Sequence, residues 1–299
     1  MTSRLASEKF LVTRAHLKDD DNQPSTSGQA FCIREHHVAD NSKRRLVAAL
    51  VVAFFSSHGL GVTATEVSST ISTSNTPKTV LVLGGTGQLG RAIVGELSKT
   101  PARITIFTRE SSDRTGFESI SPTRPPIEWV TGDLLNTADV DRVFAAMTFD
   151  IVINAVRVED GDIHFYEKIM APLVRNASKT GTRLFIHHGA VGAGSNVEKF
   201  RTLGWERVPG IFDRLKDQGI GEELLRTSGV PYVIIRNARL YPSTHAATGK
   251  AVLTEDDSVL TPMTRADIAR LTLACIDNPT CVNKTFHVSD PSLAWPPSK

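Results

Sequence analysis

One stretch of the chain joins a strand, a cluster of glycines and a helix without a break, and it constrains the fold more than any other. The apolar run Val80–Leu83 predicts a buried strand. Four glycines follow it directly: Gly84, Gly85, Gly87 and Gly90. Apolar residues then recur at helical spacing: Leu89, Ala92, Ile93 and Leu97. A strand, a tight turn and a helix N-terminus are therefore expected in immediate succession.

A turn of this kind can hold a pyrophosphate group. Glycine lets the backbone turn sharply and approach a ligand closely, while the first N–H groups of the helix and its dipole attract negative charge. A purely structural glycine turn in another α/β protein is the alternative, and the flanking strand and helix disfavour it. The sequence therefore predicts a dinucleotide cradle formed by these consecutive residues: Gly84, Gly85, Thr86, Gly87, Gln88, Leu89, Gly90 and Arg91.

Strands and helices alternate along the rest of the chain as far as residue 290. Further strands are expected at Arg103–Thr108, Ile127–Thr131, Asp150–Val156, Arg183–Ile186, Pro231–Arg236 and Lys284–Val288. Helices are expected at Gln88–Ser98, Phe212–Thr227 and Thr264–Ile276. Another is expected to begin after a cap at Asn136 or Thr137. A further helix is expected at Tyr166–Lys179, with a kink or a restart at Pro172. This alternation predicts βαβ units and a parallel sheet. The expected fold is α/β, a single Rossmann-like doubly wound domain with its ligand beyond the carboxyl ends of the strands.

The composition is that of an ordinary soluble protein, with 40% hydrophobic and 22% charged residues among 299. The net charge of +2 gives no electrostatic reason to expect nucleic acid as a partner. The three cysteines show neither a metal-ligand spacing nor a disulfide framework, so no metal is expected and Cys275 is assigned to the core. The expected partner is a small-molecule substrate, and the sequence leaves the oligomeric state open.

The chain before the fold has a different character. Residues 1–42 are polar without periodicity, which predicts a disordered leader. Residues 43–64 run from a basic cluster through the apolar stretch Leu46–Phe55 to small residues, which is the layout of a secretory signal. A signal normally begins at the terminus, so an anchor or a stray apolar helix is the alternative. The protein is expected in the cytoplasm, or exported if this segment is a cleaved signal. Residues 65–77 then form a linker, 78–292 the folded domain and 293–299 a tail.

The end of the second strand indicates which dinucleotide binds. An NAD site needs Asp or Glu there for the ribose hydroxyls, whereas this chain has Thr108 and Arg109. An arginine beside small hydroxyls, with Arg91 as a second charge, suits a 2′-phosphate. The sequence therefore predicts NADP(H) in preference to NAD(H), although a solvated arginine at a strand end is the alternative for Arg109.

The ordered set of motifs resembles a known family. It consists of the glycine motif, Gly132-Asp133-Leu134 after the third strand, Asn154-Ala155 after the fourth, and the segments Ser228–Leu240 and Thr264–Asp290. Together they resemble the atypical short-chain dehydrogenase/reductases, most closely the NmrA-like and flavin-reductase-like NAD(P)-binding branch, over about Lys78–Asp290. The resemblance implies that Asp133 and Leu134 flank the adenine and that Asn154 and Ala155 line the cofactor path. A turn or helix-capping role is the alternative for Asp133.

The chain departs from that family at the position of the proton donor. By the resemblance, active members use a Tyr-x-x-x-Lys pair, in which the tyrosine passes a proton as hydride moves. None of the tyrosines Tyr166, Tyr232 and Tyr241 has a lysine four residues later. The best alignment puts Phe212 at the tyrosine position and Lys216 at the lysine position.

Two functions are open on these residues. In the first, the chain is an NADPH-dependent oxidoreductase that transfers hydride to a small carbonyl, quinone or flavin-type acceptor without the tyrosine. His188 would be the acid and Lys216 the retained member of the pair. Packing against the neighbouring loop is the alternative role of His188. In the second, the chain binds NADP(H) without turnover as a redox sensor or regulator, as NmrA-like regulators do.

Two loops are expected to set specificity, because the sheet is only a scaffold. They are Asn196–Gly210, in which Trp205 is a candidate cap over the acceptor, and Ala238–Gly249. Arg236 and Asn237 close the sixth strand and are expected to tie down the neighbouring loop rather than to face the substrate.

Overall fold

The computed structural model of the protein describes residues 77–120, 126–158 and 162–295. The predicted leader, the signal or anchor segment and almost all of the linker lie outside these residues, as does most of the tail. Within the part of the chain that is described, no helix is both long and apolar enough to cross a membrane.

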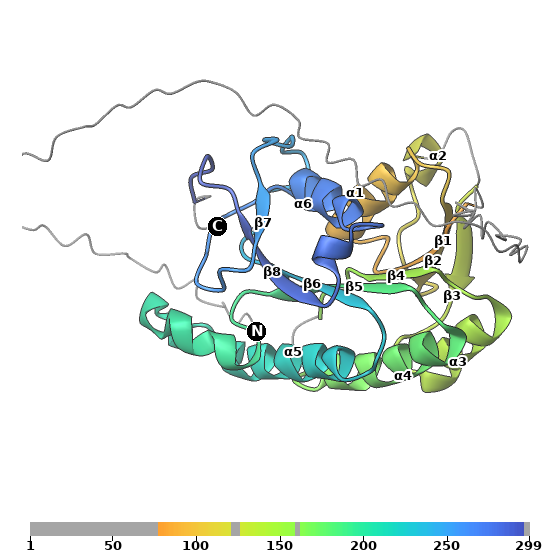
Figure 1. Ribbon diagram of the computed structural model, residues 1–299, viewed down its shortest axis with the longest axis horizontal. Coiled ribbons are helices and arrows are strands. Elements are labelled where there is room, and N and C mark those ends of the chain that lie inside the picture. The colour runs from red at the N-terminus through yellow and green to blue at the C-terminus, as the bar shows by residue number, and fades with distance from the viewer. Residues whose placement is uncertain (1–76, 121–125, 159–161, 296–299) are drawn as a thin grey trace, which may run out of the picture. The chain divides into compact units, whose positions relative to one another are not determined.

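The described strands form a single sheet in the order β3-β2-β1-β4-β5-β6-β8-β7 (Figure 1). The strands are β1 (Thr79–Leu83), β2 (Arg103–Thr108), β3 (Glu128–Thr131), β4 (Ile151–Asn154), β5 (Leu184–Ala190), β6 (Tyr232–Asn237), β7 (Val252–Thr254) and β8 (Lys284–Ser289). All neighbouring pairs are parallel except β7 and β8, which pair antiparallel at the edge. The predicted α/β class with a mostly parallel, doubly wound sheet is confirmed.

Helices cover both faces of this sheet. The α-helices are α1 (Gln88–Leu97), α2 (Phe117–Ile120), α3 (Thr137–Ala146), α4 (Phe165–Thr180), α5 (Ile211–Arg226) and α6 (Arg265–Ala274). The 3-10 segments are η1 (Gly194–Leu203), η2 (Trp205–Arg207) and η3 (Pro279–Cys281). Helices α1 and α6 pack together on one face, and α3, α4 and α5 lie in a row on the other.

The strand residues explain these two layers, because successive side chains in a strand point to opposite faces. In β1, Val80 and Val82 pack with α1 and α6, whereas Leu81 and Leu83 pack with α3, α4 and α5. Strands that are buried on both faces have nearly continuous apolar sequences, which is why the sequence pattern predicted where they lie.

The strand order reverses between β1 and β4. From β1 the chain builds outward to β2 and β3, and from β4 it builds in the opposite direction to β5 and β6. In open sheets of this type, the crevice beyond the carboxyl ends of the strands at such a switch point holds the ligand. The glycine turn after β1 and the residues after β4 therefore border the candidate site.

Three local expectations need correction. Helix α4 does not restart at Pro172 but continues from Phe165 to Thr180, and Asn176 Nδ2 donates to the carbonyl oxygen of Pro172. The segment expected as a loop after β5 contains η1 and η2. Strand β7 was not predicted, because three residues at a sheet edge give no periodic signal.

The expectation that the chain has no disulfide is also wrong. Cys275 at the end of α6 is bonded to Cys281 in η3, with their Cα atoms 5.5 Å apart. The turn between them includes Asp277 with φ of 65°, and this left-handed residue folds the chain back on itself. Cys275 lies in the buried core, as expected, and the disulfide bond connects it there to the segment that leads into β8.

Candidate functional site

The backbone of the glycine turn is packed so closely that side chains could not replace two of its glycines. Gly84 has φ of 72°, and a Cβ there would lie 3.0 Å from the backbone of Ala155 and Val156. A Cβ on Gly90 would lie 2.1 Å from the carbonyl oxygen of Gly84. The N–H of Gly87 donates to that same oxygen at 3.0 Å. The first turn of α1 therefore packs directly on the turn after β1, at the exit of β4.

The N-terminus of α1 is suited to an anion. Gly87 is the N-cap residue, no side chain caps the helix, and its first turn has no acidic residue. The first N–H groups of a helix have no partner within the helix, and the helix dipole is positive at this end. The backbone from Gly84 to Gly90 thus fits the pyrophosphate of a dinucleotide, as the sequence predicted.

A second group of residues lies where β2 and β3 end. Thr108 is buried and stands beside Thr131 in the register of the two strands. Arg109 is exposed at the next position. Arg114 Nη2 donates to Thr131 Oγ1 at 2.9 Å, and the guanidinium lies 5.1 Å from the centre of the Trp129 ring. The sequence analysis missed Arg114, although its position five residues after Arg109 in the same loop was a usable signal.

Arg91 does not present its charge to this place. Its Nε donates to the carbonyl oxygen of Thr86 at 3.0 Å, and its Nη1 and Nη2 donate to the carbonyl oxygens of Thr115 and Asp113 at 2.6 and 2.7 Å. The guanidinium also lies over the Phe117 ring. Three backbone carbonyls occupy most of its donors, so the expectation that Arg91 supplies a second charge to a 2′-phosphate is corrected. Arg91 joins the glycine turn to the loop after β2.

Asp133 has the geometry of its alternative role in a turn. Its Oδ1 accepts the N–H of Leu135 at 2.9 Å, and its own N–H donates to Asp139 Oδ2 at 3.0 Å. Leu134 is half-buried against the core layer under α3 and α4. Both residues lie at the carboxyl edge of the sheet after β3, and an adenine contact for them stays a prediction.

The buried side chain of Asn154 holds the backbone that follows β4. Its side chain is fully buried, with Oδ1 accepting the N–H of Val156 at 3.1 Å and Nδ2 lying 3.2 Å from His187 Nδ1. The expectation that this side chain lines the cofactor path is therefore corrected. The backbone of Ala155, by contrast, lies against Gly84 and borders the cradle.

His188 lies in the core rather than in an open site. Its Nε2 is 3.2 Å from Thr272 Oγ1 on α6, and its Nδ1 is 3.4 Å from Asn237 Nδ2. Burial, with a smaller contribution from His187, lowers the pKa of His188 to about 3. A general acid at neutral pH must be protonated, so this environment removes the basis for His188 as the proton donor and favours its packing role.

The two predicted catalytic residues are also on opposite sides of the sheet. His188 faces α6, whereas Lys216 is exposed on α5, which covers the other face. Phe212, one turn before Lys216, is half-buried, with the guanidinium of Arg201 5.8 Å from its ring centre. His188 and Lys216 therefore do not belong to one constellation.

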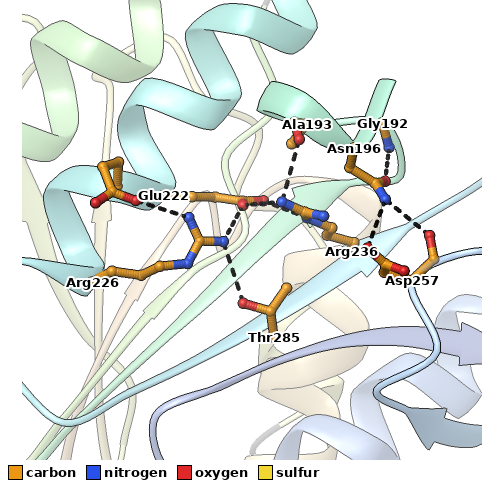
Figure 2. A network of polar contacts seen from close by, with 9 residues as sticks. Gly192, Ala193, Asn196, Glu222, Arg226, Arg236, Asp257 and Thr285 are labelled. Carbon is orange, nitrogen blue, oxygen red and sulfur yellow. Dashed lines mark hydrogen bonds and ion pairs between the residues drawn. The ribbon is translucent and has the colours of Figure 1, made fainter. Parts of the chain in front are cut away.

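A buried ion pair lies under the end of β5 (Figure 2). Glu222 on α5 is fully buried, and its carboxylate accepts from Arg236 Nη2 at 2.7 Å, Arg236 Nε at 3.1 Å and Arg226 Nη2 at 2.7 Å. A Cβ at Gly189 would lie 2.6 Å from Glu222 Oε1. The carboxylate occupies the space beside Gly189, and a side chain at position 189 would displace it.

The same network holds the segment after β5. Arg236 Nη2 donates to the carbonyl oxygen of Ala193 at 3.3 Å. Asn196 Oδ1 accepts the N–H of Gly192 at 2.8 Å, and its Nδ2 donates to the carbonyl oxygen of Asp257 at 2.9 Å. The prediction that Arg236 ties down the neighbouring loop is confirmed. Glu222 and Asn196 were missed, since a glutamate in a charged helix gives no sign in the sequence that it is buried.

Trp205 packs on this segment rather than standing free. Its ring stacks on Phe200 with centroids 5.5 Å apart, and a Cβ on Gly192 would lie 2.5 Å from it. The aromatic pair therefore covers the turn that follows β5. A contact between Trp205 and an acceptor stays a prediction.

The fold and the cradle together define a nucleotide-binding Rossmann protein, and the comparisons with known proteins make this more specific. A family model described as NAD(P)H-binding matches residues 84–279, so the chain belongs to that family. None of the curated proteins compared with the chain matches it. The NAD(P)-binding character that the resemblance implied is confirmed by this match, while membership of the atypical short-chain dehydrogenase/reductases and of their NmrA-like branch stays a prediction.

Solved structures share the fold at low sequence identity. The anaerobillin reductase ChuY from Escherichia coli is 18% identical, with 73% of this chain and 100% of that chain covered and a TM-score of 0.62. A short-chain dehydrogenase/reductase from Veillonella parvula in complex with NADP is 17% identical, with 72% and 96% covered and a TM-score of 0.58. A putative NAD-dependent epimerase/dehydratase from Bacillus halodurans is 21% identical, with 71% and 93% covered and a TM-score of 0.55.

Proposed function

We propose that the protein is an NADPH-dependent oxidoreductase that reduces a quinone, a flavin-type acceptor or a small carbonyl. The observation that carries the proposal is the glycine turn, in which a Cβ at Gly84 or Gly90 would collide with backbone and which leads into the uncapped N-terminus of α1. When bound, the nicotinamide cofactor would supply the hydride. Two of the similar solved structures are named as a reductase and as a dehydrogenase/reductase in complex with NADP, which supports the same class of reaction.

The arginines at the ends of β2 and β3 support NADPH over NADH. Arg109 follows β2, where an NAD site needs an acidic residue, and Arg114 brings a second guanidinium to the same edge. Guanidinium groups bind phosphate through strong charge-assisted hydrogen bonds. In this role Arg114 replaces Arg91, whose donors are occupied by backbone carbonyls.

The chain's own residues narrow the acceptor. Phe212 carries no transferable proton, and buried His188 is neutral at physiological pH. An acceptor whose reduced form takes its proton from water fits these two positions best, which favours quinones and flavins among the three acceptor types. The task of the protein is then to hold cofactor and acceptor in line at close range and to exclude water from the path of the hydride.

The same two residues favour a second candidate function, a redox sensor or regulator that binds NADP(H) without turnover. A protein with this role needs the cradle but no proton donor. Phe212 and His188 are the observations in its favour, so binding and turnover must be measured separately.

The experiment uses the full chain with NADPH and a panel of a quinone, a flavin and an aldehyde. NADPH binding is followed by calorimetry and NADPH oxidation by absorbance. Gly90→Ala places a Cβ against the carbonyl of Gly84 and should abolish binding and oxidation together. The matched control is Gly95→Ala in the same helix, where a Cβ meets nothing within 4 Å. Tight NADPH binding without oxidation of any panel member would replace the oxidoreductase with the sensor.

A further inference from the structure

The segment that follows β4 forms one side of the glycine turn. The N–H of Ala155 donates to the carbonyl oxygen of Leu83 at 3.0 Å, which continues the pairing of β4 with β1 beyond the last residue of the strand. A Cβ on Gly84 would lie 3.0 Å from the carbonyl group of Ala155 and 3.0 Å from the Cα of Val156. A displacement of this backbone therefore acts directly on the turn that leads into α1.

Side chains hold both backbone hydrogen-bonding groups of Val156. Its N–H donates to Asn154 Oδ1 at 3.1 Å, and its carbonyl oxygen accepts the hydroxyl of Tyr166, a residue of α4, at 3.1 Å. Tyr166 is only 2% exposed. Burial raises the pKa of its hydroxyl to about 12. The hydroxyl therefore keeps its proton at neutral pH and acts as a donor to this carbonyl.

Contacts with α5 fix the position of Tyr166. The N-cap residue of α4 makes no side-chain cap. Instead, buried Asp217 on α5 accepts the N–H groups of Tyr166 and Glu167 at 2.7 and 3.0 Å, so it caps α4 from the neighbouring helix. Gly221 on α5 also lies against the tyrosine, because a Cβ there would be 3.0 Å from Tyr166 Cβ. The hydroxyl therefore reaches Val156 from two helices that are packed together.

We propose that Tyr166 is a positioning residue for the cofactor, and that its hydroxyl holds the backbone of Val156 against the glycine turn. This inference rests on the NADPH binding of the proposed function and adds to it a residue outside the glycine motif. In a doubly wound sheet the two halves of a dinucleotide lie on either side of the switch point. The backbone that Tyr166 holds lies on the side of β4, so it acts on the pyrophosphate and the nicotinamide. The adenine and the 2′-phosphate belong to the side of β2 and β3.

The test compares Tyr166→Phe with the native full chain by calorimetry, with NADPH and adenosine 2′,5′-bisphosphate as ligands. The substitution keeps the ring against Gly221 and removes only the hydroxyl. It should weaken NADPH binding by about fivefold, which corresponds to one hydrogen bond. The affinity for the bisphosphate should stay unchanged, because that ligand has neither a pyrophosphate nor a nicotinamide. The matched control is Tyr232→Phe, which should change neither affinity, since Tyr232 begins β6 at the opposite edge of the sheet.

An unchanged NADPH Kd in Tyr166→Phe would overturn the inference, because a tyrosine with a structural role alone affects the free energy of unfolding and not this Kd. An equal loss of affinity for the two ligands, an equal loss in Tyr232→Phe, or no NADPH binding by the native chain would also overturn it. These readouts are equilibrium constants, so they are independent of turnover. NADPH binding that Tyr166→Phe weakens, without oxidation by any acceptor, would remove the reductase and leave the role of Tyr166. Oxidation with an unchanged Kd in this variant would remove the role of Tyr166 alone.

Discussion

Glu222 and Arg236 form an ion pair that has almost no contact with solvent, with Arg236 Nη2 2.7 Å from Glu222 Oε2 and side-chain exposures of 10% for the arginine and 0% for the glutamate. The pair joins α5 to β6, and its second arginine, Arg226, reaches Thr285 on β8. The same guanidinium of Arg236 holds the carbonyl of Ala193. A single carboxylate thus links a helix, two strands and the segment that follows β5.

Glu222→Ala should destabilise the fold strongly, because it leaves Arg236 as a buried charge without its partner. Breaking a buried pair in this way typically costs about 3–5 kcal/mol. Urea unfolding of the full chain measures the change. Glu223→Ala is the control, because Glu223 is exposed and its contact with Arg226 is a long one, at 3.4 Å. This substitution should change the free energy of unfolding by less than about 1 kcal/mol. Equal changes in the free energy of unfolding for the two substitutions would show that the buried ion pair contributes no more to stability than the exposed one.

Arg109→Gln and Arg114→Gln should weaken NADPH binding and spare NADH. Each removes a guanidinium from the edge where β2 and β3 end, and the loss of one charged hydrogen bond to a phosphate corresponds to about tenfold in Kd. Calorimetry with both cofactors gives the answer. Arg103→Gln at the other end of β2 is the control, because Arg103 is exposed and 3.5 Å from Glu128. An unchanged NADPH Kd in both site variants would refute the 2′-phosphate assignment.

Acidification should destabilise the protein through His187 and His188. Burial is the largest cause that lowers their pKa values, to about 4 and about 3. The unfolded chain, with ordinary histidine pKa values near 6.5, binds protons that the folded chain does not. Above about pH 6.5 the two histidines therefore do not reduce the free energy of unfolding. Below that pH the free energy of unfolding decreases by about 1.4 kcal/mol per pH unit for each histidine.

Urea unfolding between about pH 7 and pH 5 measures this loss. His188→Gln should remove part of the pH dependence and should leave any NADPH oxidation at neutral pH largely intact. A pKa near neutrality in the rate profile that disappears in His188→Gln would restore His188 as the acid and contradict the buried, neutral imidazole.

The disulfide predicts a thiol count. The chain has three cysteines, and Cys275 is bonded to Cys281. Thiol titration of the unfolded, unreduced protein should therefore detect only Cys32, and reduction should expose all three cysteines. The double variant with both Cys275→Ser and Cys281→Ser should lose about 2 kcal/mol of stability, the entropy of closing a short loop. A full thiol count without reductant would contradict the bond.

The sequence located the fold through its buried strands and its glycine turn. Runs such as Val80–Leu83 and Ile151–Ile153 are apolar because both faces of the sheet are covered, and this pattern depends only on local residues. The cap of α3, expected at Asn136 or Thr137, is Asn136, whose side chain accepts the nearby N–H of Ala138. Strand β7 and the Cys275–Cys281 bond depend on where distant or turning segments meet, which periodicity does not encode.

The candidate site was less predictable because tertiary contacts decide the role of a polar side chain. Arg91 reads as a phosphate ligand next to the last glycine, but backbone carbonyls of the loop after β2 take its donors. His188 reads as an acid, but α6 covers it. Arg114 and Glu222 could not be ranked above other charged residues until the ends of β2, β3, β5 and β6 were in place.

The central claim is tested most directly by following hydride from NADPH to the acceptor in a single turnover. The full chain is mixed with NADPH and, in separate experiments, with a quinone, a flavin and an aldehyde, and the loss of NADPH absorbance is followed over one turnover. The account predicts NADPH oxidation by the quinone or the flavin, and no oxidation in Gly90→Ala. NADPH that is tightly bound but remains reduced with all three acceptors would contradict it.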